Sequence, residues 1–300
     1  MVGMRKLIVI VLLLLLYGFT PLFALDEGLL EEADALYDSD EFEAAILVLD
    51  DAAATATTDA ERAEVLWRLA RATLGVGEGL EDDEAPTEDV LAVYEEGEQY
   101  GIEAVEADPT NNLGYYWQSA NIGRWGQAKG ILDSLFKAGP MRDLLRESVR
   151  YDPAHAGSFY VLGQLYSEVP GFISFGNVDY AVGLARKSVD LHESELASGE
   201  EDEVFHDYYI QLANHLIKRN WNENRRSREQ QRKEDRHDEA PDALERGWHY
   251  EGVVEIPRMS DREEAAALLS RMIRDLESLR DRSDGQERQL ERARELQEEL

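Results

Sequence analysis

One recurring arrangement of large and small side chains constrains the fold of this chain more than any other feature. The segment Phe159-Tyr-Val-Leu162-Gly163-Gln-Leu-Tyr166 places large residues three or four positions apart, with a glycine among them. On a helix these residues share one face, and the missing side chain of Gly163 lets a second helix approach closely. Ala181 and Ala185 offer matching small side chains further along the chain. The pattern therefore predicts two antiparallel helices packed as a hairpin.

The same pattern recurs along the chain, which predicts a series of such hairpins. Three further copies are Leu66-x-x-Leu69-Ala70, the weaker Tyr116-x-x-Ser119-Ala120-x-x-Gly123, and Tyr209-x-x-Leu212-Ala213-x-x-Leu216. An earlier hairpin is expected around Ala33 and Ala45. The Asp-Pro pairs at 108–109 and 152–153 close helices, because proline cannot continue one. We expect about five stacked hairpins over residues 25–221, and hence an all-α solenoid with C-terminal capping helices.

The two ends of the chain differ from this central part. Residues 1–24 combine Arg5 and Lys6, the apolar run from Leu7 to Tyr17 and the small Ala24, which is the order of a secretory signal peptide. Cleavage near Ala24 is expected, with an uncleaved anchor as the alternative, and either places the body of the protein in a periplasm or envelope. Residues 222–260 predict a charged linker or exposed helix with an irregular segment. Residues 261–300 regain a helical period and predict an amphipathic helix that caps the last repeat or contacts a partner.

The charge balance excludes one class of partner. The chain has 63 Asp and Glu residues against 31 Lys and Arg, a formal net charge of −32. Because such a surface repels polyanions, nucleic-acid binding is not expected. Residues 26–109 hold 27 acids and three arginines, which favours steering toward a basic partner. A saline habitat or a GC-rich genome would also produce an acid-rich, lysine-poor surface, so the origin of the acidity stays open.

No catalytic constellation is recognisable in the sequence. The absence of cysteine removes disulfides, thiolate catalysis and cysteine-ligated zinc, and the six histidines form no H-E-x-x-H pair. The glycines of Gly75-Val-Gly77-Glu-Gly79 follow no predicted strand and precede a run of acids, so they indicate a solvated loop rather than a phosphate site. We expect no metal, no cofactor and no enzyme activity.

Several segments resemble known helical-repeat families. They are Leu66-Trp-Arg-Leu-Ala-Arg-Ala72, Tyr115-Tyr-Trp117, Lys129-Gly130-Ile131, Asp152-Pro-Ala-His-Ala-Gly157 and Val169-Pro170-Gly171-Phe172. Together with the repeats, the stretch from Leu29 to Leu216 resembles tetratricopeptide-repeat (TPR) proteins. Within them it looks most like the T component associated with tripartite ATP-independent periplasmic (TRAP) transporters, and like its relatives, the regulators of microtubule dynamics. The resemblance implies a TPR superhelix that binds the solute-binding protein of a TRAP-type uptake system for carboxylates or other organic solutes.

A groove is predicted on the inner surface of the superhelix. In stacked hairpins the first helices line a concave surface, and the residue after the first large core position should face it. Two rows of residues result, one helical turn apart. The first row consists of Trp67, Trp117, Tyr160 and Ile210, and the second consists of Arg71, Asn121, Gln164 and Asn214. These rows suit a protein segment or a hydrophobic or carboxylate ligand, with Arg71 pairing the carboxylate. The alternative is that the rings fill the interior of the superhelix.

A second contact surface is predicted if the aromatic residues on insertions are exposed. These residues are Trp125, Phe136, Phe172 and Phe175, and the alternative is that they pack back onto the solenoid. The function expected from all these features is an exported, non-enzymatic TPR scaffold that binds a periplasmic protein partner. The rival is a structural or self-assembling envelope protein without a ligand, whose C-terminal helix drives homo-oligomer formation.

Overall fold

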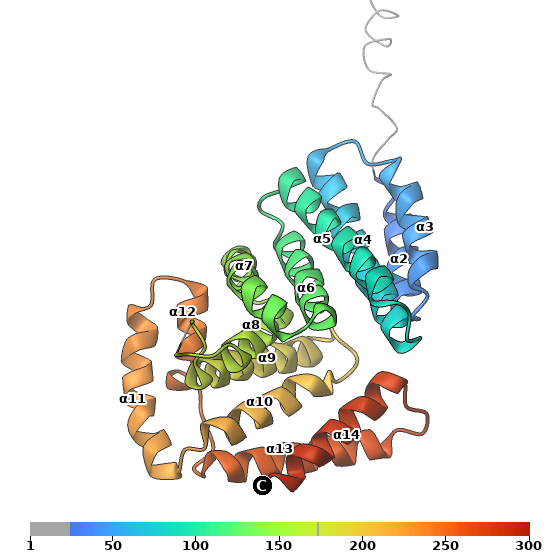
Figure 1. The fold of residues 1–300 in the computed structure, drawn as a ribbon. Coiled ribbons are helices and arrows are strands. Elements are labelled where there is room, and N and C mark those ends of the chain that lie inside the picture. The colour runs from blue at the N-terminus through green and yellow to red at the C-terminus, as the bar shows by residue number, and fades with distance from the viewer. Residues whose placement is uncertain (1–24, 173) are drawn as a thin grey trace, which may run out of the picture. The chain divides into compact units, whose positions relative to one another are not determined.

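The computed structural model describes residues 25–172 and 174–300, apart from the side chains of residues 131–134 and 284 (Figure 1). Over these residues every regular element is helical, which confirms the predicted all-α class. The expected signal peptide, residues 1–24, lies outside the described residues. The chain divides into two compact units between Pro109 and Thr110. None of the described helices combines the length and apolar character that crossing a bilayer requires.

The first unit consists of two helical hairpins. Its helices are α2 (Glu27–Asp38), α3 (Phe42–Ala53), α4 (Asp59–Asp82) and α5 (Thr87–Ala107). Thr58 caps the start of helix α4, because its hydroxyl accepts from the amide of Glu61 while the Glu61 carboxylate accepts from the amide of Thr58, a capping box. Ala33 and Ala45, the small residues predicted for the opening hairpin, are each 1% exposed and pack between α2, α3 and α4.

The glycine cluster of residues 75–79 lies inside helix α4, so the expectation of a solvated loop there is wrong. A Cβ atom on Gly77 would lie 2.3 Å from the ring of Tyr94 on α5, and one on Gly75 would lie 2.7 Å from the ring of Phe42 on α3. Both glycines are buried, because the two aromatic rings rest directly on the α4 backbone. Gly79 has nothing within 4 Å of the corresponding position. The acids that follow mark the end of the helix rather than a loop.

The second unit stacks further hairpins of the same kind. Its helices are α6 (Asn112–Lys129), α7 (Ile131–Tyr151), α8 (Ala156–Glu168), α9 (Val178–Ser198), α10 (His206–Arg219), α11 (Glu223–Glu239), α12 (Ala243–Trp248), the short 3-10 helix η1 (Tyr250–Gly252), α13 (Asp261–Ser278) and α14 (Asp284–Glu298). Helix α6 pairs with α7 and α8 with α9. A Cβ atom on Gly163 would lie 3.5 Å from the backbone of Ala181 and of Ala185, the close helix approach that the repeat pattern predicts.

Helix α10 finds its partner after an insertion in the chain. It packs against α13, and α14 then packs on both, as Figure 1 shows. Leu269 and Met272 on α13 and Leu290, Ala293 and Leu296 on α14 are buried with the apolar residues of α10. The region 261–300 is therefore two helices rather than one, and these five apolar side chains are covered within the unit.

Helix α11 falls in the region 222–260, where we expected a linker or an exposed helix. It is a helix with a buried charged face, because Arg226 and Lys233, seven positions apart, are each only 3% exposed. They belong to a group that we name the charge cluster, which consists of Asp179, Arg186, Arg219, Arg226, Lys233, Glu251, Asp261 and Glu264. Four cations face four acids, so the cluster holds α9, α10, α11, η1 and α13 together without a net charge.

Candidate partner-binding surfaces

In the first unit, the two predicted groove residues Trp67 and Arg71 already have partners within the chain. The ring of Trp67 is 6% exposed, and its Nε1 donates to Glu64 at 3.1 Å. The guanidinium of Arg71 lies 4.1 Å from the ring centre of Tyr37 and forms an ion pair with Asp34. An incoming carboxylate would have to displace that of Asp34. Arg71 therefore stabilises the unit through Tyr37 and Asp34, and it does not form an open carboxylate-binding site.

The surroundings of Arg71 are largely dry. Burial raises the pKa of the Tyr37 hydroxyl to about 12, although the nearby Arg71 opposes the rise. The neighbouring Arg68 shares the Asp34 carboxylate, with its Nε 3.0 Å from Oδ1, and lies 4.1 Å over the Trp67 ring. This stacking of two arginines on aromatic rings ties α2 to α4 and stabilises the opening hairpins of the unit.

In the second unit, four of the six predicted groove residues are half-buried and two are inaccessible. The half-buried residues are Trp117, Tyr160, Gln164 and Asn214, on α6, α8 and α10. Asn121 and Ile210 are both 0% exposed, so their predicted place at the groove surface is wrong. Ile210 packs in the core with α13, because α13 covers the face of α10 that the repeat pattern leaves open.

Tyr208 takes the position that the sequence analysis gave to Ile210. Its ring centre lies 5.1 Å from that of Tyr160 and 4.7 Å from that of Phe205. We name these three residues the inner aromatic cluster. Burial raises the pKa of the hydroxyls of Tyr160 and Tyr208, which stay neutral at physiological pH. Gln164 donates to the Tyr160 hydroxyl at 3.0 Å and fixes its direction. Phe205 is 43% exposed, so the cluster reaches the surface at its edge.

A pocket of about 360 Å³ opens beside the inner aromatic cluster. Phe205 and Tyr208 form part of its wall, and residues at the start of α14 also line it. Three acidic residues, Glu195, Glu201 and Glu203, also line the pocket. Burial raises the pKa of Glu195, while a hydrogen bond with His192, 3.4 Å away, lowers it in part. Aromatic faces next to carboxylates are the surroundings that a lysine or arginine side chain prefers. We name this site the acidic pocket.

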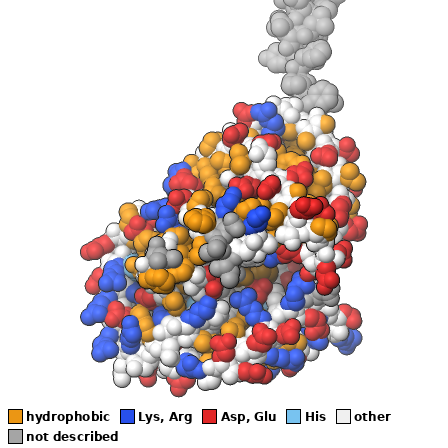
Figure 2. All heavy atoms as spheres, in the orientation of Figure 1, with side chains coloured by type: hydrophobic (Ala, Val, Ile, Leu, Met, Phe, Trp, Pro, Cys, Tyr) orange, Lys and Arg blue, Asp and Glu red, His pale blue; other side chains and the backbone are white. Residues whose placement is uncertain are grey.

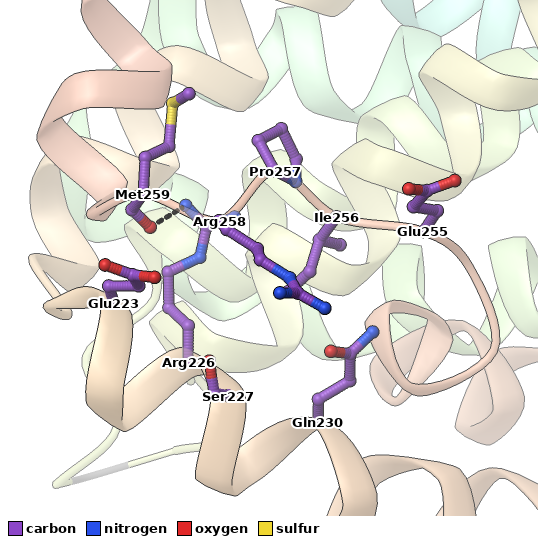
Figure 3. Close-up of a pocket in the computed structure, with 9 residues that line it drawn as sticks. All are labelled: Glu223, Arg226, Ser227, Gln230, Glu255, Ile256, Pro257, Arg258 and Met259. Atoms are coloured by element: carbon purple, nitrogen blue, oxygen red, sulfur yellow. Dashed lines mark hydrogen bonds between the residues drawn. The ribbon is translucent and has the colours of Figure 1, made fainter.

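A second pocket, of about 750 Å³, lies between α11 and residues 255–259 (Figure 3). Arg226 donates to the carbonyl of Met259 at 2.8 Å, and Gln230 donates to the carbonyl of Val254 at 3.1 Å, so these side chains hold the segment on α11. Arg258 extends toward Gln230 across the opening, as Figure 3 shows. Glu223 and Glu255 also line the pocket, so it contains acidic as well as basic side chains. The chemistry of this pocket favours no particular ligand.

The sequence comparisons point to one group of proteins. Residues 29–172 match the family "Regulator of microtubule dynamics protein 1-3". The chain is 30% identical over 151 residues to regulator of microtubule dynamics protein 1 of Bos taurus, and 26% identical over 149 residues to that of Mus musculus. The matches cover 50% and 49% of this chain but only 44% and 46% of the relatives, so the chain spans less than half of their length. Regulators of microtubule dynamics are among the families that the sequence resembles, and these comparisons do not confirm the resemblance to the T component.

One solved structure is similar in outline. The crystal structure of a thermophilic TPR protein of Thermus thermophilus matches 76% of this chain and 99% of its own, with a TM-score of 0.46 and 17% identity. At that level the likeness carries no argument about function, and the TPR-like assignment rests on the helical hairpins themselves.

The comparisons also correct the expected location of the protein. The matched relatives are mammalian proteins, and mammalian cells have no periplasm. The prediction of a periplasmic or envelope protein is therefore wrong. That prediction depended on the apolar N-terminal run and on the resemblance to the T component. These two features do not separate an exported bacterial protein from other proteins with an apolar N-terminal segment.

Proposed function

We propose that this protein is a non-enzymatic, TPR-like scaffold whose second unit binds a basic segment of a partner protein. The observation that carries the proposal is the acidic pocket, where the half-exposed Phe205 lies beside Tyr208 and three glutamates line the same pocket. A lysine or arginine of the partner enters the pocket, and its aliphatic stem packs on the rings. The bound segment continues past Tyr160 and Gln164 along α8, with Trp117 and Asn214 as further contact residues.

The charge of the whole chain supports the same kind of partner. A net charge of −32 speeds the approach of a basic surface, and the 27 acids of residues 26–109 supply most of it. Charge of this sign opposes direct contact with the acidic tails of tubulin. A link to microtubules, which the name of the relatives suggests, would therefore run through a basic partner. A TRAP solute-binding protein would require the periplasmic location that is wrong, so it forms no part of the proposal.

The rival function is self-assembly through the C-terminal helix. Leu290 and Leu296 of α14 are 2% and 8% exposed and pack against α10 and α13. The apolar face that would drive assembly is thus already covered within the unit, which favours the scaffold over the rival. Sedimentation of the full chain distinguishes the two, since the rival requires oligomers and a chain that sediments as a monomer would exclude it.

The proposal is tested with fluorescently labelled peptides that differ only in charge, one series rich in lysine and arginine and one rich in glutamate. Binding of the basic series should weaken about tenfold in Glu201→Lys, Glu203→Lys and Phe205→Ala, because each change removes a charge or ring that touches the bound side chain. Asp202→Lys is the matched control, since Asp202 is exposed between these glutamates but does not line the pocket. If all the lysine variants weaken binding equally, the attraction is general and the pocket is not the site.

A further inference from the structure

The region around α6 and the start of α7 is almost free of acidic residues. Between Thr110 and Arg142 the sequence has one acid, Asp133, in 33 residues, whereas about one residue in five of the whole chain is acidic. The same stretch carries four cations, Arg124, Lys129, Lys137 and Arg142. Arg142 forms an ion pair with Asp143 at 2.7 Å, so its charge is locally balanced. Asp133 offsets only one of the other three cations, so this part of an otherwise strongly acidic protein has a net positive charge.

Large aromatic side chains project from this region and from the segment between α8 and α9. Phe136 on α7 is 83% exposed and Phe172, in the segment between α8 and α9, is 89% exposed. The two lysines gather around a third ring, with Lys137 Nζ 5.1 Å and Lys129 Nζ 5.9 Å from the ring centre of Trp125. Exposure on this scale is unusual for phenylalanine in a folded protein. The sequence predicts a second contact surface if these aromatic residues are exposed, and Phe136 and Phe172 are exposed.

The exposed segment between α8 and α9 is attached to α7. Phe175 packs against Tyr166, with 5.1 Å between the ring centres, and Arg142 on α7 lies 4.7 Å over the Phe175 ring. Phe136 precedes Arg142 by six residues, which is about 9 Å along a helix. Residues 169–177 contain no charged side chain. Figure 2 shows hydrophobic side chains gathered over this part of the second unit. We name Arg124, Trp125, Lys129, Phe136, Lys137 and Phe172 the basic aromatic surface.

We propose that the basic aromatic surface docks on a membrane that contains anionic lipids. The charge of the surface, opposite to that of the rest of the chain, complements phosphate and carboxylate headgroups, whereas such headgroups repel the acidic remainder. Phe136 and Phe172 enter the boundary between headgroups and acyl chains, and Trp125 lies at headgroup level beside the two lysines. The inference is independent of the acidic pocket and of the proposed partner.

A membrane explains the observations better than an acidic protein does. An acidic partner would account for the three cations, but it would gain little from two almost fully exposed phenylalanines next to a segment without any charge. A bilayer interface rewards both features at once, since its binding strength combines buried apolar area with attraction to anionic lipid.

Site-specific fluorescent labels test the proposal on the full chain. Because the chain has no cysteine, Phe136→Cys and Phe172→Cys each create a unique labelling site. Leu47→Cys on α3, where the leucine is 68% exposed, is the matched control. With an environment-sensitive dye, the labels at 136 and 172 should shift to the blue and resist an aqueous quencher on phosphatidylserine-containing vesicles, and the label at 47 should not. Vesicles of phosphatidylcholine alone should give little response.

The charge requirement has its own comparison. The double variant Lys129→Gln with Lys137→Gln should lose affinity for the anionic vesicles by about fivefold for each lysine. Arg228→Gln with Arg232→Gln removes the same charge from the exposed side of α11 and should leave the affinity unchanged. The proposal is overturned if the labels at 136 and 172 remain in water, if all three labels respond alike, or if the two double variants bind equally. Labels that respond to an acidic protein but to no vesicle would also overturn it.

Discussion

Replacing Glu251 by glutamine should destabilise the second unit strongly, because this carboxylate is the centre of the charge cluster. Glu251 is 2% exposed and receives Arg186 at 3.1 Å, Arg219 at 2.5 Å and Lys233 at 2.9 Å. The neutral amide keeps the shape but leaves one uncompensated positive charge among three buried cations. Removing one partner from a buried ionic group costs about 3–5 kcal/mol. For a unit of this size that corresponds to a fall in Tm of roughly 6–20 °C.

Glu255→Gln is the matched control, since Glu255 lies four residues further on and is exposed. It should change the free energy of unfolding by less than about 0.5 kcal/mol. Thermal melting gives the stability of each variant, and hydrogen exchange followed by mass spectrometry shows whether α10, α11 and α13 lose protection while α2 to α5 keep theirs. A Glu251→Gln variant within about 1 kcal/mol of the parent would refute the assignment of the cluster as a buried, mutually dependent group.

The same group sets the acid sensitivity of the second unit. Burial alone would raise the pKa of Glu251, but the surrounding cations hold it well below its usual range. A carboxyl whose pKa is lowered by folding stabilises the native state above its unfolded pKa of about 4.3, and this stabilisation disappears as the pH falls toward the folded value. Between about pH 5 and pH 2 the parent should therefore lose stability more steeply than Glu251→Gln, as urea unfolding at several pH values would measure.

Three further predictions concern the first unit. Gly77→Ala should destabilise it by about 1–3 kcal/mol, because the new methyl group meets the Tyr94 ring. Gly79→Ala should instead stabilise it by about 0.5–1 kcal/mol, because alanine favours a helix and has room there. Equal melting points of the two variants would contradict the α4–α5 packing. Trp67→Ala should cost about 3–5 kcal/mol in urea unfolding, because Trp67 is only 6% exposed and its loss leaves a cavity. Binding of basic peptides should weaken as salt rises from low to physiological strength, and an affinity indifferent to salt would exclude steering by residues 26–109.

The register of a single helix shows how far the repeat pattern reaches. Tyr160 follows the core residue Phe159 and lies at the edge of the core, as the pattern predicts. Ile210 follows the core residue Tyr209 in the same way but is fully buried, and Tyr208 takes the half-exposed place. The difference arises because α13, which comes more than forty residues later, covers that face of α10. A local pattern contains no information about which distant helix will pack on it.

Charged residues were the least predictable part of the chain. Arg226 and Lys233 lie on one face of α11, but burial of that face depends on Glu251, Asp261 and Glu264, which the fold brings in from other elements. Arg71 is a second example. The sequence predicts that its cation binds a ligand carboxylate, but the guanidinium pairs with Asp34, 37 positions earlier. Whether a charge faces water or a buried counter-charge is decided by tertiary contacts.

What the sequence by itself determined is the helical hairpin. Small residues such as Gly163, Ala181 and Ala185 recur at helical spacing, and close packing of two helices follows from that local geometry alone. What only the tertiary structure decided is which surfaces remain open, namely the acidic pocket beside Phe205 and the rings of Phe136 and Phe172. The physical reason is that a helix forms from contacts three and four residues apart, whereas exposure depends on every element that packs against it.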